Sequence, residues 1–403
     1  MNKIIAADLD LAERAGARTS PAPARFPTLA AALEFTAAAW AAGLRGKLPD
    51  PDTEYWKLGI NVNRALDIVR DFWFRGGIDL PLNLFVEAPT IRKMAARLHD
   101  GSALHPLELL HLRDGDASAP LFLFAGGTGL LMEYTDFVGS LDFPGVIYGL
   151  PLGGMDGRTP YSKSVEEEAE RSARLILRVQ PAGPYRLMGY SSGGCNTLET
   201  ARVLRNAGHA SGFLGLLDTG LTDHHWSTRL WLSYMVPELA MAVTKRLKVA
   251  LGRRVARSAP SPADIAVKDR PDILARRRGT RYEFRFRNPA SPDYPHYTPY
   301  WRGDVTPRDG ETRRNSLRMW GFYRPAPYDG HVSFFVAKGV NPISCYPNRY
   351  WHEYLGDIEW VWVPGNHITM MIGKYAAKLT AEVSVRLSPR AAPRHTPSPI
   401  DFT

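Results

Sequence analysis

The chain has 403 residues, of which 44% are hydrophobic and 23% are charged, as is usual for globular domains that bury a core. Its two cysteines, Cys195 and Cys345, are too few for a disulfide framework or a cysteine-based zinc site, so we expect no metal. The start of the chain lacks a signal-peptide pattern, and no stretch approaches the roughly 20 apolar residues of a membrane span. We therefore expect a cytoplasmic protein with no membrane partner.

The net charge of +9 is unevenly placed along the chain. Much of the excess lies in "KRLKVALGRRVAR" (245–257) and "RRRGTRYEFRFR" (276–287). Because no zinc-finger, RNA-binding or helix-turn-helix signature accompanies these segments, we expect no nucleic-acid partner. Docking of an acidic protein and a solvated helix face remain as the two explanations for the basic segments.

The first quarter of the chain has a helical pattern. Residues 1–24 end in "RTSPAPAR" and are expected to form a flexible tail, whereas 25–100 contain strong helix formers such as "LAAALEFTAAAWAAGL". Two turn-rich stretches, at 100–106 and 113–120, flank a short strand-like piece, "LELLHL". We expect a small N-terminal helical bundle with a boundary near residue 102.

Beyond that boundary, short apolar runs alternate with helical stretches, which predicts a mostly parallel sheet covered on both faces. Residues 221–325 break the alternation and are expected to form an insertion, and the last residues, 389–403, have the composition of a disordered tail. The apolar runs are "LFLFA" (121–125), "VIYGL" (146–150), "YRLMGY" (185–190), "FLGLLD" (213–218), "VSFFVA" (332–337) and "EWVWV" (359–363).

The stretch "MGYSSGGC" contains a G-x-S-x-G pattern between a predicted strand and a predicted helix. This is the setting of a nucleophile elbow, in which flanking glycines, here Gly189 and Gly193, leave room for a strained serine. The pattern identifies Ser191 as the candidate nucleophile. Ser192 lies on the helical side, where its N–H can face an oxyanion.

A serine nucleophile needs a base and an orienting carboxylate, which follow it in the chain order Ser, Asp or Glu, His. Asp218 ends the next sheet strand, whereas its nearest rival, Asp223, lies past the strand end. His367 lies after the last strand and before the C-terminal helix, which is the expected place for the base. The other histidines considered occupy less suitable positions: His224, His225, His331 and His352.

The turn after the first central strand, "LFLFAGGTGLL", is glycine-rich. Gly126, Gly127 and Gly129 allow the backbone to approach the site closely. The turn lacks the Lys-Ser/Thr of a phosphate-binding loop and does not fit G-x-G-x-x-G. We therefore predict an oxyanion hole formed by the N–H groups of Gly127 and Ser192.

With these residues in place, 103–388 resembles the α/β-hydrolase thioesterase domain that ends nonribosomal peptide and polyketide synthase lines. The matching pieces include "PLFLFAGGTGLLMEY", "YRLMGYSSGG", "GLLDTG" and "WHEYLGDIEWVWVPGNHITMM", in that order. The resemblance implies Ser191 as nucleophile, Asp218 as orienting carboxylate and His367 as general base. It also implies that the insertion at about 221–325 is a helical lid over an acyl channel.

Residues 25–100 resemble the carrier domain that precedes such a thioesterase, through "FTAAAWAAGL", "EYWKLG" and "IDLPLNLFVEAPTIRKMAARL". In that family the second helix opens Leu-Gly-Gly-x-Ser-Leu, and the serine holds a phosphopantetheine arm. Here the stretch is "LGINVN": Leu58 and Gly59 match, but Ile60 replaces the second glycine and Val62 replaces the serine. We therefore expect a degenerate carrier without a covalently bound cofactor.

The two resemblances imply a serine thioesterase or acyltransferase of secondary-metabolite biosynthesis that acts in trans. Its substrate would be an acyl, peptidyl or polyketide chain on the phosphopantetheine of a separate carrier protein or synthase module. Hydrolysis, cyclisation and transfer to another nucleophile are all compatible with an acyl-Ser191 intermediate. Six aromatic residues favour either a large acyl group or packing of the lid on itself: Trp226, Trp231, Tyr234, Trp301, Trp320 and Tyr323.

Three other functions are alternatives. A carboxylesterase or lipase would act on free esters, and an editing hydrolase would clear wrong acyl groups from synthases. A non-enzymatic recruitment protein would keep the hydrolase fold without its chemistry. The complete set of Ser191, Asp218 and His367 argues against this last alternative, because a decayed site is expected to lose a member.

Overall fold

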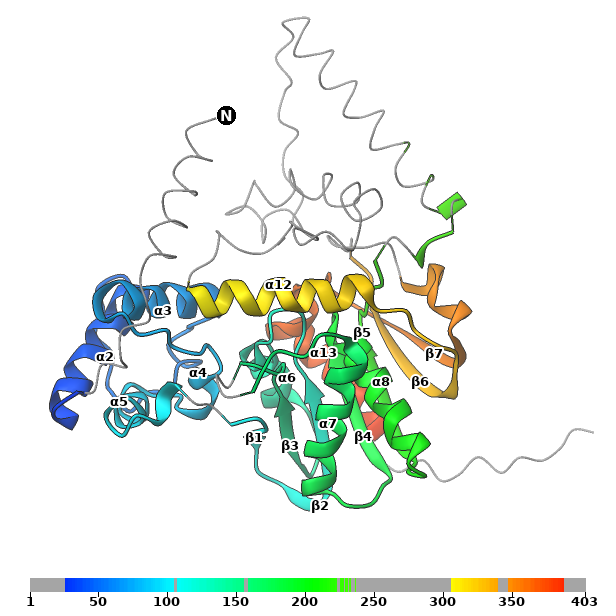
Figure 1. The fold of residues 1–403 in the computed structure, drawn as a ribbon, viewed down its shortest axis with the longest axis horizontal. Coiled ribbons are helices and arrows are strands. Elements are labelled where there is room, and N and C mark those ends of the chain that lie inside the picture. Colours follow the sequence, from blue (N-terminus) through cyan, green and yellow to red (C-terminus); the bar gives the residue numbers. More distant parts are fainter. Residues whose placement is uncertain are drawn as a thin grey trace, which may run out of the picture.

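The computed structural model describes residues 26–104, 107–155, 159–222, 225–227, 229–230, 232, 236, 306–339 and 347–387. These residues form a small helical domain and a larger α/β domain, and one long helix lies along both (Figure 1). The two predicted tails and the two basic segments, 245–257 and 276–287, lie outside the described residues.

The helical domain corresponds to the predicted N-terminal bundle. Three of its helices begin at a side-chain N-cap, because Thr28, Asn61 and Thr90 each accept a hydrogen bond from a backbone N–H three residues later. The helices bury Trp40 and Phe85 among other apolar side chains. The elements are α2 (Leu29–Gly43), α3 (Val62–Gly76), α4 (Leu84–Glu87), α5 (Ile91–His99) and the 3-10 turn η1 (Ser102–Leu104).

The α/β domain is built on a seven-stranded sheet of order β1-β3-β2-β4-β5-β6-β7. β1 is antiparallel to β3, and every other neighbouring pair is parallel. This arrangement confirms the predicted α/β-hydrolase fold with a mostly parallel sheet. The strands are β1 (Leu110–Arg113), β2 (Asp116–Phe124), β3 (Gly145–Leu150), β4 (Tyr185–Tyr190), β5 (Ser211–Leu217), β6 (Tyr328–Ala337) and β7 (Leu355–Val363).

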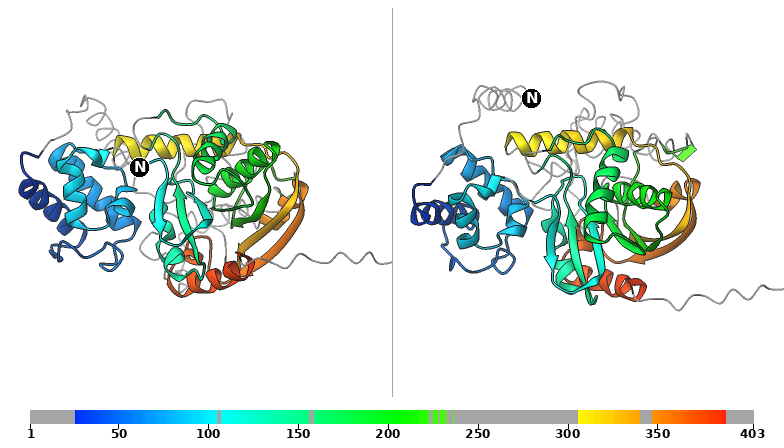
Figure 2. Two further views of the ribbon diagram at one scale, coloured as in Figure 1. Left: turned by 90° about the horizontal axis from the view of Figure 1, so that it is seen from below. Right: turned by 60° about the horizontal axis from the view of Figure 1, so that its bottom comes forward.

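Helices cover both faces of the sheet (Figure 2). Successive side chains of a strand point to opposite faces, and the two hydrophobic clusters of the domain follow this alternation. Phe122 of β2 belongs to the cluster with α7 and α8, whereas the neighbouring Leu123 belongs to the cluster with α6 and α13. The helices and adjoining 3-10 turns are η2 (Leu131–Tyr134), α6 (Thr135–Ser140), α7 (Val165–Val179), α8 (Gly193–Asn206), η6 (Thr369–Met371) and α13 (Gly373–Leu387).

The longest described part of the insertion is α12 (Pro307–Phe322), which lies across the top of both domains in Figure 1. At its start, the Arg308 N–H donates to a carboxylate oxygen of Asp79, 3.1 Å away, in the helical domain. Near its end, Trp320 Nε1 donates to the Gly220 carbonyl, 2.8 Å away, just after β5. The helix therefore joins the helical domain to the edge of the sheet where β5 ends.

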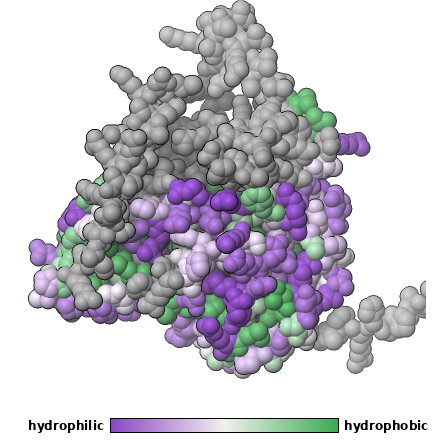
Figure 3. Space-filling view, in the orientation of Figure 1, coloured by the Kyte–Doolittle hydropathy of each residue, from purple (hydrophilic) through white to green (hydrophobic). Residues whose placement is uncertain are grey.

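Three further features concern the surface, the helices and the metal-ligating side chains of the described residues. Hydrophilic side chains cover much of the described surface on the face drawn in Figure 3. Across the described ranges, no helix is both long enough and apolar enough to span a bilayer. In the same ranges, no group of three or more His, Cys, Asp or Glu side chains is arranged to hold a metal ion.

Candidate active site

Ser191 lies at a sharp turn between β4 and α8. Its φ of +57° is a conformation that side-chain-bearing residues rarely adopt, and its N–H donates to the Leu217 carbonyl, 2.9 Å away. A Cβ at Gly189 would lie 2.1 Å from Thr197 Oγ1, and one at Gly193 would lie 2.4 Å from the Ala125 carbonyl oxygen. The two glycines are therefore required for strand and helix to approach each other around the serine.

Ser191, His367 and Asp218 form a continuous hydrogen-bonded series. His367 Nε2 lies 3.0 Å from Ser191 Oγ, and His367 Nδ1 lies 2.8 Å from Asp218 Oδ2. Asp218 and His367 are 1% and 3% exposed, whereas Ser191 is half-buried. A carboxylate that accepts from Nδ1–H leaves Nε2 free of a proton, so it can accept the proton of the serine hydroxyl.

The ends of the strands bring these three residues together. Ser191 follows β4, Asp218 follows β5 with a φ of +43°, and His367 lies in the loop after β7. The second oxygen of Asp218, Oδ1, accepts a hydrogen bond from the Ala337 N–H at the end of β6, 3.2 Å away. Parallel strands place their carboxyl ends at one edge of the sheet, which is the usual location of sites in such folds.

Tyr190 is a contributor that sequence reasoning missed. Its hydroxyl donates to the His367 carbonyl, 2.6 Å away, and its ring stacks on the imidazole with centroids 5.0 Å apart. Asn366 also shapes the histidine loop, since its Oδ1 accepts from the N–H groups of Ile368 and Thr369. Tyr190 occupies the first variable position of the G-x-S-x-G pattern, and Asn366 directly precedes the histidine. The only sequence signal for these two residues was their position next to Ser191 and His367.

The predicted oxyanion donors lie on adjoining segments beside Ser191. A Cβ at Gly127 would lie 3.1 Å from Ser192 Oγ, and one at Gly126 would lie 3.6 Å from the Ser191 Cβ. Within the described part of the chain, no acceptor is assigned to the N–H of either Gly127 or Ser192. Two backbone donors are thus available next to the serine.

The rival residues do not contact the serine, or fall outside the described residues. His331 is exposed and pairs with Asp357, 3.0 Å away, and His352 is also exposed. His225 bonds instead to the Tyr354 hydroxyl and the Tyr323 carbonyl. Asp223 and His224 are not among the described residues.

Cys195, which lies on α8 close to Ser191, is not a competing nucleophile. Its side chain is fully buried. Burial, and secondarily the neighbouring Glu199 carboxylate, raise the pKa of the Cys195 thiol. The thiolate is the reactive form of cysteine, so this side chain stays an inert thiol at neutral pH.

The described aromatic residues of the predicted lid are engaged in packing. Trp226 stacks on Tyr350 with centroids 6.3 Å apart. The Tyr323 hydroxyl donates to Glu199 Oε2, 3.1 Å away, and Trp320 bonds to a backbone carbonyl after β5. These contacts favour a packing role over an acyl-binding role for the three residues. The other members of the predicted set, Trp231, Tyr234 and Trp301, lie outside the described residues.

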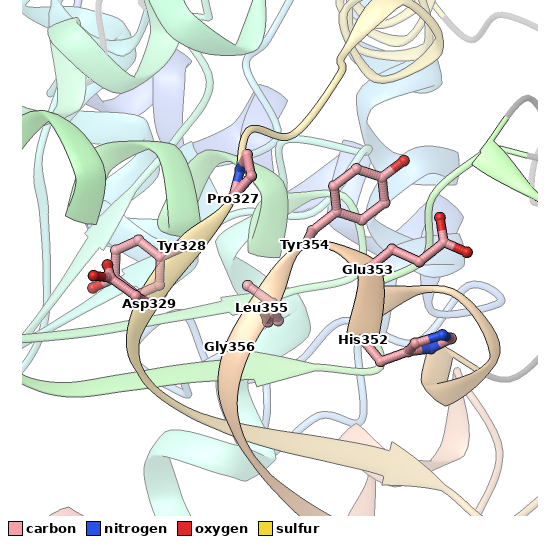
Figure 4. Close-up of a pocket in the computed structure, with 8 residues that line it drawn as sticks. All are labelled: Pro327, Tyr328, Asp329, His352, Glu353, Tyr354, Leu355 and Gly356. Carbon is pink, nitrogen blue, oxygen red and sulfur yellow. The ribbon is translucent and has the colours of Figure 1, made fainter.

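A groove of about 500 Å³ lies away from the triad, where β6 and β7 begin (Figure 4). The Ser191 site lies where the strands end, so the groove is at the opposite edge of the sheet. The 3-10 turns η4 (Pro347–Arg349) and η5 (Trp351–Glu353) precede β7 at this edge. Its lining residues are Pro327, Tyr328, Asp329, His352, Glu353, Tyr354, Leu355 and Gly356.

The fold and the site define an α/β-hydrolase with a hydrogen-bonded serine, histidine and aspartate in the chain order of that fold. Comparison with known proteins narrows the class. Residues 119–257 match the family model of the thioesterase domain. This part of the chain, which contains Ser191 and Asp218, is therefore similar in sequence to thioesterase domains.

Two relatives and one solved structure illustrate the similarity. Over 187 residues the chain is 33% identical to indigoidine synthase of Streptomyces lavendulae, and the aligned segment covers 46% of this chain and 14% of that protein. Over 342 residues it is 29% identical to enterobactin synthase component F of Escherichia coli K12, and here the aligned segment covers 84% of this chain and 23% of that protein. The chain thus spans less than a quarter of either relative.

A crystal structure of a holo four-domain nonribosomal peptide synthetase bound to AMP and glycine superposes with a TM-score of 0.52 and 18% identity. The superposition covers 92% of this chain and 26% of that one. At this level of identity the likeness concerns the fold. It extends over most of the chain, and so beyond the segment that the thioesterase family model matches.

Proposed function

We propose that the protein releases or transfers an acyl or peptidyl chain from a carrier-protein thioester through an acyl-Ser191 intermediate. The observation that carries the proposal is the hydrogen-bonded series from Ser191 Oγ through His367 to Asp218. Ser191 and Asp218 lie in the segment that matches the thioesterase family model. A serine hydroxyl is a weak nucleophile until a neighbouring base accepts its proton.

In the first half-reaction, Ser191 Oγ attacks the thioester carbonyl carbon while His367 Nε2 takes the hydroxyl proton. Asp218 holds the imidazole in position and stabilises the imidazolium that forms. The carbon–sulfur bond then breaks, and the imidazolium returns its proton to the leaving thiolate. The acyl group remains on Ser191 as an oxygen ester.

In the second half-reaction, His367 takes a proton from water, or from a hydroxyl or amine, as that group attacks the ester. The Ser191 oxygen leaves and regains its proton from the imidazolium. In both steps the carbonyl oxygen develops negative charge, and the N–H groups of Gly127 and Ser192 are the proposed donors to it. Each such donor stabilises the transition state by about 3 kcal/mol.

We further propose that the substrate arrives on a separate carrier protein. In the helical domain, α3 begins at Val62, the position at which the resemblance places the phosphopantetheine serine. No serine or threonine occurs between Thr53 and Thr90, so a shifted alignment offers no other hydroxyl. A degenerate carrier domain of this kind cannot load its own arm, which supports action in trans and the absence of a covalent cofactor.

The proposal is tested by supplying the purified protein with an acyl group as a carrier-bound thioester, a pantetheine thioester and a matched oxygen ester. We expect turnover of both thioesters, loss of turnover in Ser191→Ala, and a fluorophosphonate adduct that peptide mapping places on Ser191. An adduct on Ser192 would contradict the assigned nucleophile. Preference for the oxygen ester would favour a carboxylesterase, and preferential cleavage of short acyl groups from carriers would favour an editing hydrolase.

A further inference from the structure

A buried amide of the helical domain contacts the active-site side of the α/β domain. Asn83, which directly precedes α4, is 1% exposed. Its Nδ2 donates to the Gly129 carbonyl, 2.9 Å away, and its Oδ1 accepts from the Leu131 N–H, also 2.9 Å away. Both partners belong to the loop after β2 that contains Gly127, which we call the 126–131 loop.

The 126–131 loop has an irregular backbone that needs external support. Gly129 has a φ of +71°, and its N–H closes a turn by donating to the Gly126 carbonyl, 2.9 Å away. A Cβ at Gly129 would lie 2.2 Å from Met155 Sδ. Asn83 bonds to the backbone on both sides of Leu130, so it restrains the segment that leads back to Gly127.

The helical domain is attached firmly enough to serve as this support. The Tyr55 hydroxyl lies 2.6 Å from Thr135 Oγ1 of α6, and the Arg308 N–H of α12 bonds to Asp79. The cavity where the helical domain, the 126–131 loop and α12 meet measures only about 20 Å³. One hydrophobic cluster also includes residues of both domains. Packing and hydrogen bonds together hold Asn83 against the loop.

We propose that Asn83 is a positioning residue for the oxyanion hole, and that the carrier-like domain is a fixed part of the active-site scaffold. Asn83 touches no reacting atom, and it acts by fixing the 126–131 loop so that the Gly127 N–H points to the developing oxyanion. This inference rests on the thioesterase chemistry proposed above. It adds a role for the helical domain that does not involve carrying a substrate.

The proposal predicts an effect on kcat that leaves KM nearly unchanged, because the oxyanion forms only after substrate has bound. Loss of one oxyanion donor typically lowers kcat about 10²- to 10³-fold. Asn83→Ala removes the support of the donor and leaves the donor itself, so we expect a smaller fall in kcat, about 10- to 100-fold. Tyr55→Phe is the matched control, since it removes an interdomain hydrogen bond that does not involve the loop.

Asn83→Asp supplies a pH signature that a general loss of stability would not. A protonated aspartic acid can donate to the Gly129 carbonyl and accept from the Leu131 N–H, as asparagine does, whereas the carboxylate cannot donate. The ratio of Asn83→Asp kcat to wild-type kcat should therefore rise as the pH falls. Taking the ratio removes the pH dependence that both proteins share through His367.

Three results are expected together: Asn83→Ala lowers kcat at constant KM, Tyr55→Phe keeps kcat within about twofold, and the Asn83→Asp ratio rises at low pH. An Asn83→Ala kcat within twofold of wild type, or an equal loss in Tyr55→Phe, overturns the proposal. If Asn83→Ala fails to fold, the Asn83→Asp ratio decides, and a ratio independent of pH overturns the proposal.

Hydrogen exchange separates this inference from the proposed function. Amides of the 126–131 loop should exchange faster in Asn83→Asp at neutral pH than in wild type, and should be unchanged in Tyr55→Phe. An unchanged rate overturns the positioning role even if the protein is an active thioesterase. Conversely, a wild-type protein that cleaves no thioester refutes the proposed function, while the exchange rates still report whether Asn83 orders the loop.

Discussion

Replacing Asp218 with asparagine exchanges one carboxylate oxygen for an NH₂ group without changing the shape of the side chain. In the native site, Oδ2 faces His367 Nδ1 at 2.8 Å, and Oδ1 accepts from the Ala337 N–H at 3.2 Å. The Ala337 N–H is buried and needs an acceptor, so it should retain the amide oxygen and direct the NH₂ group at His367. Nδ1 must then accept a hydrogen bond, which moves the imidazole proton to Nε2.

An imidazole protonated at Nε2 cannot take the proton of Ser191. A tautomer error of this kind lowers kcat by about 10⁴-fold in a serine protease, and we expect a similar loss here. At about 1.4 kcal/mol for each factor of ten, this corresponds to about 5 kcal/mol of transition-state stabilisation. Because the substitution keeps the packing intact, the melting temperature should change by only a few degrees.

The assay is single-turnover cleavage of a pantetheine thioester, with the melting temperature recorded for each variant. Asp223→Asn is the control and should retain wild-type kcat. A kcat for Asp218→Asn within tenfold of wild type would refute the tautomer argument. Equal loss in Asp223→Asn, with Asp218→Asn active, would transfer the orienting role to Asp223.

Three further outcomes are expected. Tyr190→Phe removes the hydroxyl that donates to the His367 carbonyl, which should lower the free energy of unfolding by about 1 kcal/mol and reduce kcat, as urea unfolding and steady-state kinetics would measure. Burial raises the pKa of the half-buried Glu133 from 4.5 to about 7. Between pH 4.5 and about 7 the folded protein then keeps a proton that the unfolded chain releases. The free energy of unfolding should therefore fall as the pH rises through this range, and it should fall less in Glu133→Gln. Charge reversal at Arg253, Arg254 and Arg257, in the basic segment 245–257, should raise the KM for a carrier-bound substrate at low salt. The KM for a pantetheine thioester should stay unchanged.

The sheet and the order of the site residues could be predicted because buried parallel strands carry continuous apolar runs. "YRLMGY" and "EWVWV" fall within strands of the structure, "LFLFA" does so except for its last residue, Ala125, and "LELLHL" overlaps the edge strand β1. Once the strand order is that of an α/β-hydrolase, Ser191, Asp218 and His367 must all follow strand ends at one edge. The order of the residues and their places at strand ends therefore predicted contacts between residues up to 176 positions apart.

Other features depend on contacts that no local pattern encodes. Asn83 reads as a polar residue before a helix, and its bonds to the 126–131 loop follow only from the docking of two domains. The sequence did not predict α12 within the insertion, because the buried side of this helix includes Thr312, Arg313 and Ser316 and has no continuous apolar stripe. Arg313 can be buried there because Asp309, one turn earlier, lies 3.4 Å away.

The hydrophobic cluster that joins the two domains limits how this chain can be recombined with others. Trp40 and Phe85 of the helical domain belong to the same buried cluster as Phe122 and Leu198 of the α/β domain. A cut between the domains would expose apolar surface on both fragments, and such surfaces promote aggregation. An exchange of either domain with that of another protein would therefore have to transfer both domains as one block.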